Sequence, residues 1–214
     1  MTTYFTAEYT CAVCGQRHPF TVVGSTNRFG YPDLDLRPAP MERDTIHTWV
    51  QTCPDCGYTA GTIDKETSVD ETWLSREAYK TCEGIAFGSQ LAAKFYRSYM
   101  VHLYDDDIER AAYNLLYCAW ACDDARDIEN AVKVRAKAAD LFAEVSKTND
   151  NDDLKLLRMD LLRRSGQFDR LLNEYRTVIF SDDLYKRIAS FQMKRAIVHD
   201  TGCHSVEEVV MLPK

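Results

Sequence analysis

The pattern of hydrophobic and polar positions changes about a third of the way along the chain. In the first part, short β-prone runs such as Tyr4-Phe5, Phe20-Thr21-Val22-Val23 and Ile46-His47-Thr48-Trp49-Val50 are separated by segments with glycine and proline. In the second part glycine is sparse, proline is absent until the C-terminal end, and apolar residues recur three and four positions apart. We therefore expect strands and loops in residues 1–70 and a helical domain in residues 71–214.

Turn and capping signals divide the second part into separate helices. Serine or aspartate stands before most of the periodic runs, where such a side chain can cap a helix N-terminus. The tail after residue 200 is expected to add a short helix or strand. The expected helices span 75–81, with Ser75 as its cap, and then 90–103, 107–123, 127–147, 153–165, 167–180 and 182–199.

Two stretches resemble the paired helices of tetratricopeptide repeats. In the later one, Gly166, Phe168, Leu171, Tyr175 and Val178 have the spacing of the turn and second helix of such a repeat. The fit is partial, because leucine replaces the usual alanine and no proline closes the unit. The earlier stretch is AAYNLLYCAWACDDARDIENAVKVRAKAADLFAEV. Stable arrays usually need three or more repeats, so we expect the remaining helices to cap these two.

Four cysteines in the first part have the arrangement of a zinc site. Cys11 and Cys14 form one C-x-x-C pair, Cys53 and Cys56 form another, and glycine directly follows each pair. Zinc binds four thiolates at ~2.3 Å in a tetrahedron, and glycine permits the left-handed backbone that closes such a turn. We predict one structural Zn²⁺ on these four residues. The predicted fold class is mainly α, a tetratricopeptide-like helical repeat body with a small N-terminal β/loop zinc-ribbon-like module.

Two histidines leave the ligand set open. His18 lies four residues after Cys14 and His47 lies six before Cys53, so either could replace a cysteine, although packed or surface histidines are more common. A redox role for the CPDCG turn is a further alternative. Gly57 disfavours it, because a thioredoxin-type cysteine pair stands at the start of a helix.

The other chemistry-bearing residues have plainer explanations. Cys118 and Cys122 are four apart on one helix face, but apolar neighbours favour core packing. Cys203 and His204 could bind a metal only with ligands from elsewhere. Acidic clusters at helix ends are expected to cap helices or face solvent. The sequence has no nucleotide-binding glycine loop, no Gly-x-Ser-x-Gly and no His-Glu-x-x-His.

The charge distribution argues against nucleic acid as a partner. The whole chain carries a formal net charge of -7. Residues 1–70 hold nine acidic and five basic side chains, and residues 71–214 hold 24 and 21. Neither part has the basic excess of a phosphate-binding surface. Residues 154–195, called the basic stretch below, hold ten basic and five acidic side chains. This stretch could face an acidic partner, although a solvated helix surface is the default explanation.

Nothing in the sequence indicates a membrane protein. No segment approaches the ~18 uninterrupted apolar residues of a membrane span, and the start MTTYFTAEYT lacks the parts of a signal peptide. We therefore expect a cytoplasmic protein. That compartment keeps thiols reduced, which favours metal binding over disulfides for the eight cysteines.

Several motifs together resemble a known family. They are CxxCG near the start, then CPDCGYTA, YCAWACDD, GQFDRLLNEY and DDLYKRIASFQ. Over roughly residues 8–200 the chain resembles the bacterial family named domain of unknown function 2225. The resemblance implies a zinc-ribbon-like N-terminus on a tetratricopeptide-like helical body, without an established activity. Cys11, Cys14, Cys53 and Cys56 match the cysteine positions of that family.

These observations favour a zinc-binding, non-catalytic helical-repeat adaptor that binds a protein or peptide on its helical surface. One alternative is a nucleic-acid-binding zinc ribbon, which the acidic N-terminal part disfavours. Another is a metalloenzyme with an open zinc position, which requires a substitution such as His18 for one sulfur. The oligomeric state, the pathway and the identity of the partner are left open by the sequence.

Overall fold

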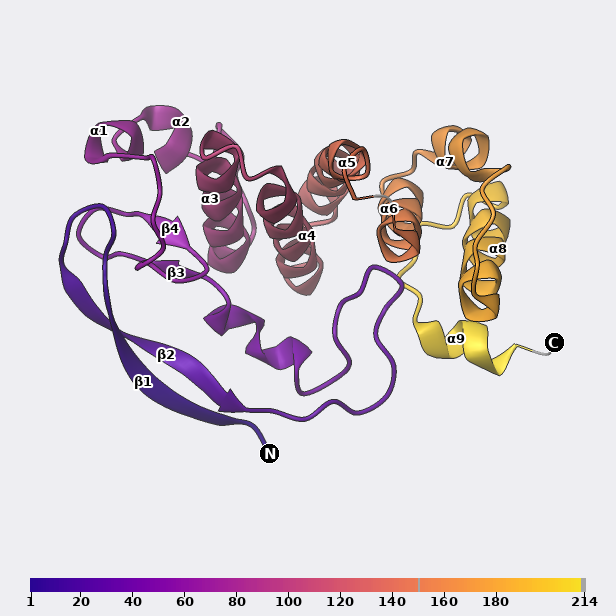
Figure 1. The fold of residues 1–214 in the computed structure, drawn as a ribbon, viewed down its shortest axis with the longest axis horizontal. Helices are drawn as coiled ribbons and strands as arrows, with labels where there is room; N and C mark the ends of the chain where they lie inside the picture. Colours follow the sequence, from indigo (N-terminus) through magenta and orange to yellow (C-terminus); the bar gives the residue numbers. More distant parts are fainter. Residues whose placement is uncertain (150, 213–214) are drawn as a thin grey trace.

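The computed structural model describes residues 1–149 and 151–212, and it confirms a mainly α fold (Figure 1). Two small antiparallel sheets and a short 3₁₀ helix come first: β1 (Thr3–Thr10) with β2 (Arg17–Ser25), η1 (Arg43–Thr48), and β3 (Gln51–Thr52) with β4 (Thr59–Ala60). The helices follow: α1 (Glu71–Leu74), α2 (Glu77–Lys80), α3 (Gln90–Tyr104), α4 (Ile108–Asp124), α5 (Ile128–Val145), α6 (Asp152–Arg164), α7 (Phe168–Tyr175), α8 (Asp183–Ile197) and α9 (Val206–Met211).

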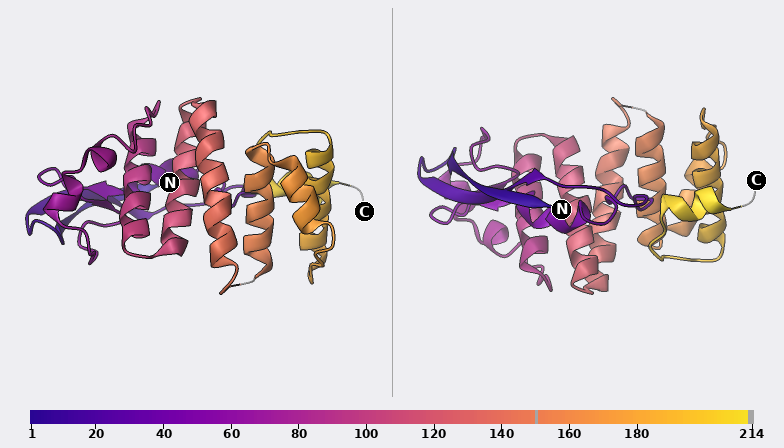
Figure 2. Two further views of the ribbon diagram at one scale, coloured as in Figure 1. Left: turned by 90° about the horizontal axis from the view of Figure 1, so that it is seen from above. Right: turned by 90° about the horizontal axis from the view of Figure 1, so that it is seen from below.

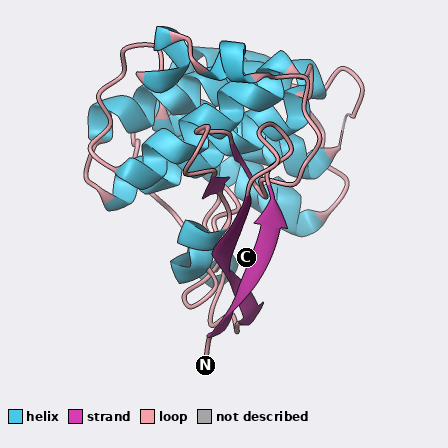
Figure 3. Cartoon of the chain, turned by 90° about the vertical axis from the view of Figure 1, so that its left-hand side faces the viewer, coloured by secondary structure: helices cyan, strands magenta, loops and turns pink. Residues whose placement is uncertain are grey.

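The long helices form one row. In Figures 1 and 2, α3, α4, α5, α6 and α8 stand side by side along the longest axis of the molecule. The chain between β2 and β3, together with α9, runs along one face of this row (Figure 1). Figure 3 shows the β1–β2 hairpin extending away from the helical layer. No helix within the described ranges has both the length and the apolar character needed to cross a membrane.

Side-chain caps start the central helices where the sequence predicts them. Ser89 accepts a hydrogen bond from the Leu91 amide at the start of α3, and Asp107 and Asp127 cap α4 and α5 in the same way. Each cap satisfies an amide that the first turn of a helix leaves without a partner. The predictions of helices over 90–103, 107–123 and 127–147 are confirmed to within two residues at each end.

The α6–α7 pair forms at the predicted turn. Gly166 has a φ of 76°, which favours glycine, and the Gln167 amide donates to the Leu162 carbonyl to close the end of α6. Leu171 and Tyr175 bury the inner face of α7. This helix ends at Tyr175 and is shorter than the predicted range of 167–180. The assignment to tetratricopeptide repeats stays a prediction.

Two sequence-based predictions of local structure are wrong. The β-prone run beginning at Ile46 lies largely in η1, where the hydroxyls of Thr45 and Thr48 donate to carbonyls three residues earlier and tighten the backbone. The predicted helix over 75–81 forms only as the single turn of α2, and a separate single turn, α1, ends before that range. Ser75 ends α1 by donating to the Thr72 carbonyl, so it does not cap the next helix. In both places local side-chain hydrogen bonds to the backbone outweigh the propensity of the run.

The N-terminal part packs directly on the helical row. Buried residues from both sides of residue 70 form one continuous cluster. The Trp49 ring lies 5.4 Å from Tyr117 and 6.5 Å from Trp120 of α4, edge to face in both cases. Further along, the backbone of Asp33 bridges that of Ser205, just before α9. The division into domains at residue 70 stays a prediction, and the two parts share a core.

A buried ion network fastens the chain between β2 and η1 to the row. The Asp35 carboxylate is fully buried, and it accepts from Trp120 Nε1 at 2.9 Å and from Arg164 Nη1 at 2.7 Å. Arg164 also donates to Asp123 at 2.9 Å, and Arg135 donates to the same carboxylate. Burial opposes ionisation of Asp123, but these two arginines hold its pKa below the usual value. The prediction that this helix-end acid caps a helix or faces solvent is wrong.

The basic stretch is partly interior. Arg158 is buried and pairs with Glu174, while Arg163 is fully buried and pairs with Asp160. Arg164 belongs to the network around Asp35. A solvated helix surface therefore does not describe these three arginines, and the positive charge that reaches the surface comes from the other residues of the stretch.

Candidate metal centre

The first cysteine pair lies in a tight backbone turn directly after β1. The Cys11 amide donates to the Gln16 carbonyl at 2.8 Å, and the Gly15 amide donates back to the Cys11 carbonyl at 2.9 Å. Gly15 has a φ of 72°, a conformation that side chains disfavour. Residues 11–15, called the first knuckle below, thus place two sulfurs on the same side of one turn.

The second pair repeats this backbone arrangement between β3 and β4. The Cys53 amide donates to the Tyr58 carbonyl at 2.8 Å, and the Gly57 amide donates to the Cys53 carbonyl at 3.0 Å. Gly57 has a φ of 79°. Residues 53–57, the second knuckle, therefore have the same hydrogen bonds at the same spacing. The glycine after each C-x-x-C pair is used as the sequence predicts.

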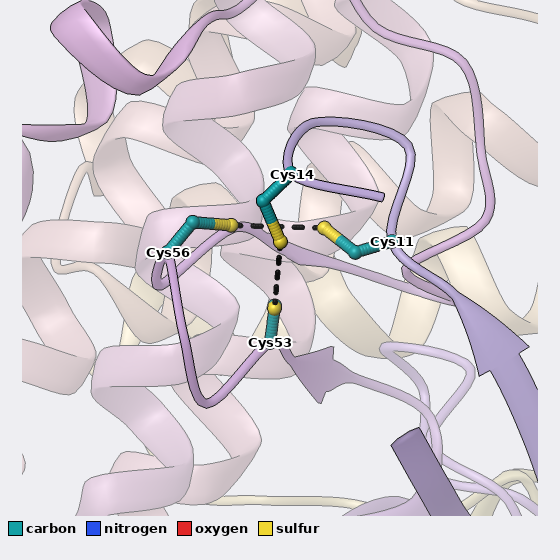
Figure 4. A group of neighbouring side chains, drawn as sticks. All are labelled: Cys11, Cys14, Cys53 and Cys56. Atoms are coloured by element: carbon teal, nitrogen blue, oxygen red, sulfur yellow. Dashed lines mark hydrogen bonds between the residues drawn. The ribbon is translucent and has the colours of Figure 1, made fainter. Parts of the chain in front are cut away.

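The two knuckles face each other and bring four sulfurs together (Figure 4). Cys11 Sγ lies 3.6 Å from Cys56 Sγ, Cys14 Sγ lies 3.6 Å from Cys53 Sγ, and all four atoms lie within 4.8 Å of one another. All four are free thiols. A tetrahedron of sulfurs at ~2.3 Å from a zinc ion has edges of ~3.8 Å. The group has the size and donor type that hold a metal ion.

Burial and mutual repulsion oppose ionisation of all four thiols together unless a cation lies between them. Burial raises the pKa of Cys11, and burial together with the neighbouring sulfurs raises the pKa of Cys56. Burial also opposes ionisation of Cys53, but backbone amides of the second knuckle outweigh it and lower the pKa of that thiol. Four thiolates at this separation repel one another, and a divalent cation offsets that repulsion.

Tyr79 of α2 supports the second knuckle from the helical side. Its hydroxyl donates to the Gly57 carbonyl at 2.8 Å, and the side chain is almost fully buried. Burial raises the pKa of Tyr79 to about 12, so the phenol keeps its proton and remains a donor at neutral pH. Sequence spacing gives no signal for this contact, because the hydroxyl approaches the knuckle from a separate element.

Replacing Tyr79 with phenylalanine tests this support. Tyr79→Phe keeps the ring and removes the hydrogen bond, so we expect the free energy of unfolding to fall by about 1 kcal/mol. Metal release to a chelator should also become faster, since outer-shell hydrogen bonds hold ligands in place. Denaturant unfolding and a release time course measure the two effects. Tyr104→Phe is the control, because that exposed hydroxyl has no hydrogen bond within the described chain. Identical behaviour of the two variants would refute the supporting role.

The two histidines that are alternative ligands by sequence lie in different surroundings, and only one of them is near the four sulfurs. His18 Nε2 lies 2.8 Å from the Asp55 carboxylate, and both groups lie near Cys53 Sγ in a second set of possible ligand atoms. His47 lies on η1, and its Nδ1 is 3.0 Å from the Asp44 carbonyl. His47 belongs to neither set of possible ligands among the described residues. His18 therefore lies beside the four sulfurs and contacts Asp55, an acid that no spacing in the sequence points to.

The cysteines of α4 lie in the core, as predicted. Cys118 and Cys122 are fully buried, and the Cys118 thiol donates to the Ala92 carbonyl of α3 at 3.2 Å. Burial and its cysteine neighbour raise the pKa of Cys118 well above its usual value. This thiol is inert packing material rather than half of a metal site.

The cysteine and histidine of the tail do not form a metal site with other described residues. Cys203 is exposed. The two ring nitrogens of His204 lie 2.9 Å from the Asp200 carboxylate and 2.8 Å from the Glu208 carboxylate. Both nitrogens thus contact local carboxylates in the segment before α9, and neither belongs to a set of possible ligands in the described chain.

The chain matches one protein-family model over most of its length. Residues 4–198 match the family described as "Uncharacterized protein conserved in bacteria (DUF2225)". The chain belongs to this family. The matched range includes both knuckles and the helices α1–α8, so the resemblance drawn from the cysteine and tryptophan motifs is confirmed. Searches of curated proteins and of solved structures return no match.

Proposed function

We propose that this member of the family is a non-catalytic adaptor, held together at its N-terminal end by one structural Zn²⁺, that binds an acidic partner segment on its C-terminal helices. The metal half of the proposal is supported by the four sulfurs and by their spacing. Soft thiolate ligands in a tetrahedral set favour zinc over magnesium or calcium, which prefer oxygen ligands.

A structural role for the zinc follows from the ligand set. Four cysteine sulfurs fill the tetrahedron, whereas a catalytic zinc keeps a position open for water or substrate. The two most buried ligands, Cys11 and Cys53, are only 2% and 1% exposed. A metalloenzyme would require one sulfur to be replaced by a group such as the His18 imidazole, and that imidazole is paired with Asp55.

The partner surface has to lie away from the face of the row that the chain itself covers. Trp49 packs against α4, and Asp35 accepts a hydrogen bond from Arg164 of α6, so both residues cover that face. In a tetratricopeptide-like row this face would otherwise be a natural place for a peptide. At the C-terminal end of the row, two grooves provide a surface that fits a partner.

Two grooves flank α8 at that end, and we call them the α8 grooves. One, of about 310 Å³, lies between α7 and α8 and carries Arg176 and Lys186; the other, of about 250 Å³, lies between α8 and α9 and carries Lys186, Arg187 and Lys194. No carboxylate lines either groove among the described residues. Ser190 lines both grooves, and the other lining residues are Met159, Tyr175, Val178, Ile179, Phe180, Ala189 and Met193 in the first, and Phe191, Val209 and Leu212 in the second.

The proposal for the partner rests on the positive charge of the α8 grooves. Arg176 and Lys194 have no ion-pair partner in the described parts of the chain, and Lys186 pairs only with the highly exposed Asp183. The Ile179 side chain is 87% exposed beside the first groove. Apolar linings with cationic rims fit a segment that carries both acidic and apolar side chains. The whole chain has a net charge of -7, which repels an acidic segment at long range. Binding of such a segment therefore depends on the local positive charge of the grooves.

A pair of designed peptides tests the partner chemistry. The first is a labelled amphipathic peptide with leucine at helical spacing and glutamate elsewhere, and the second has lysine in place of every glutamate. We expect only the glutamate peptide to bind in a fluorescence anisotropy titration. Lys186→Glu with Lys194→Glu should weaken binding roughly tenfold. Lys133→Glu on the exposed face of α5 is the control and should have little effect. Equal binding of both peptides, or no response to the double variant, would contradict the proposed partner.

A further inference from the structure

The β1–β2 hairpin exposes more apolar surface than its size can support alone. None of the residues in its two strands is buried. Tyr4 is 44% exposed and Phe5 is 55% exposed. An isolated two-stranded hairpin is only marginally stable in water, and a third strand or a covering element is normally needed. The contact of its strands with the core comes from Tyr9 and Phe20, which are partly buried, so much of the hairpin has no covering element.

The open side is the outer edge of β1. The two strands form a sheet of their own, so each strand has one free edge. Figure 1 shows β2 on the side of η1 and the helical row, with β1 on the far side. The row of amide and carbonyl groups along the outer edge of β1 pairs with no other strand in the described chain.

The two edges differ in how they are protected against pairing. β2 carries Pro19, which has no amide to donate, and Arg17. β1 reads TYFTAEYT, with neither proline nor lysine nor arginine, and its one charge, Glu8, is neutralised by Arg17 at 2.6 Å. Proteins usually protect free edges with proline, lysine or an inward charge. The β1 edge lacks these features, so it is chemically ready to accept another strand.

One face of the hairpin is largely apolar and ends at His18, which lies opposite Tyr9. The register places Phe5 opposite Val22 and Ala7 opposite Phe20, and cross-strand partners lie on the same face of a sheet. Tyr9 follows on this face, and its ring lies 6.2 Å from that of Phe20. A strand added at the β1 edge would extend this apolar face if its own side chains had the same alternation.

We propose that the added strand is β1 of a second copy of this chain, antiparallel and related by a two-fold axis at Ala7. A two-fold axis perpendicular to the sheet keeps the apolar faces of both copies on the same side. Two residues that pair across the axis must then both have odd or both have even sequence numbers, because side chains alternate between the two faces of a strand. Centring on Ala7 sets Phe5 opposite Tyr9 of the second copy and Thr6 opposite its Glu8. No like charges meet, and the smallest side chain lies at the axis.

This assembly closes after two copies. Once the two β1 strands pair, the outer edges of the four-stranded sheet are the two β2 strands, which carry Pro19 and Arg17. The interface is isologous, because the same patch serves both copies, and symmetric closure of this kind is the commonest arrangement in soluble oligomers. A different protein would have to supply its own neutral strand, whereas a second copy brings a matching strand of the same length and alternation.

Cysteine cross-linking tests the register. In a Cys203→Ser background, Ala7→Cys places two thiols opposite each other at the axis, within the reach of a disulfide. We expect a covalent dimer after mild oxidation. Thr6→Cys is the matched control: its thiol lies on the other face and diagonally displaced from its copy by ~7–8 Å between Cα atoms, so no dimer should form. Equal cross-linking of the two variants would overturn the proposed register.

The solution mass provides an independent readout. Light scattering at micromolar concentration should give twice the mass of one chain for the wild type, and the mass of one chain for Ala7→Lys, which sets two cations opposite each other. Thr21→Lys adds the same charge on β2, opposite Thr6, and should leave the dimer intact. Unchanged circular dichroism and metal content establish that each variant is folded. A monomeric wild type, or a dimer that survives Ala7→Lys, would overturn the proposal.

Discussion

Removal of the metal is expected to unfold the N-terminal strands and leave the central helices folded. The hairpin has no buried residue of its own, and the knuckles join chain segments that are far apart in sequence. In small zinc domains the apparent free energy of metal binding is on the order of 10 kcal/mol, and it is also folding free energy. The double variant Cys53→Ser, Cys56→Ser should therefore lose the metal and the hydrogen-exchange protection of β1–β4. The α4 and α5 helices should keep theirs, because they pack on each other through contacts such as that of Tyr113 with Phe142, at 5.1 Å between rings.

Cys203→Ser is the matched control for this experiment. The residue is an exposed free thiol outside the group of four cysteines, so its replacement removes a cysteine and leaves that group intact. We expect this variant to keep the metal and the protection of every strand. Loss of protection spread evenly over β1–β4 and α4–α5 in the double variant would contradict a local clamp and would indicate a single unfolding unit.

Substitution of Asp35 is expected to destabilise the whole fold by about 3–5 kcal/mol. Asp35→Ala leaves the buried Arg164 guanidinium with one carboxylate fewer, and it leaves Trp120 Nε1 without its acceptor. Removing one partner of a buried pair costs more than the pair contributes, because the remaining charge stays out of water. Denaturant unfolding of α4 and α6 would show the loss, since both helices carry members of the network.

A surface pair gives the control for the buried one. Lys133 and Glu129 of α5 lie 2.5 Å apart, with side chains 57% and 80% exposed. Lys133→Ala should cost less than about 1 kcal/mol, as exposed pairs usually do. If Asp35→Ala proved as mild as Lys133→Ala, the segment between β2 and η1 would be only loosely attached, and the covered face of the row would be open to a peptide.

The sequence predicts the grouping of the four cysteines well because the geometry of each turn is local. Each C-x-x-C-Gly motif determines its own turn, and only the meeting of the two knuckles depends on the fold. The central helices are predicted well for the same reason: Asp107 and Asp127 act within one turn of their own position. In η1, hydrogen bonds from threonine hydroxyls to nearby carbonyls compete with the β propensity of the same residues. The propensity alone therefore predicts a strand where the structure has a 3₁₀ helix.

The contacts between distant segments are what the sequence could not show. Asp35 and Arg164 are far apart along the chain, and nothing in either neighbourhood indicates that the two side chains meet in the core. The same holds for Tyr79 at the second knuckle and for Asp55 beside His18. A charged residue in a sequence is expected to face solvent, because burial of a charge becomes favourable only when a partner from another element is present.

X-ray absorption at the metal edge of the purified protein tests the central claim most directly. One Zn²⁺ per chain, surrounded by four sulfurs at ~2.3 Å, is the result that the facing knuckles predict. A protein that contains no metal, or a zinc with nitrogen or oxygen in place of one sulfur, would contradict the structural centre formed by Cys11, Cys14, Cys53 and Cys56.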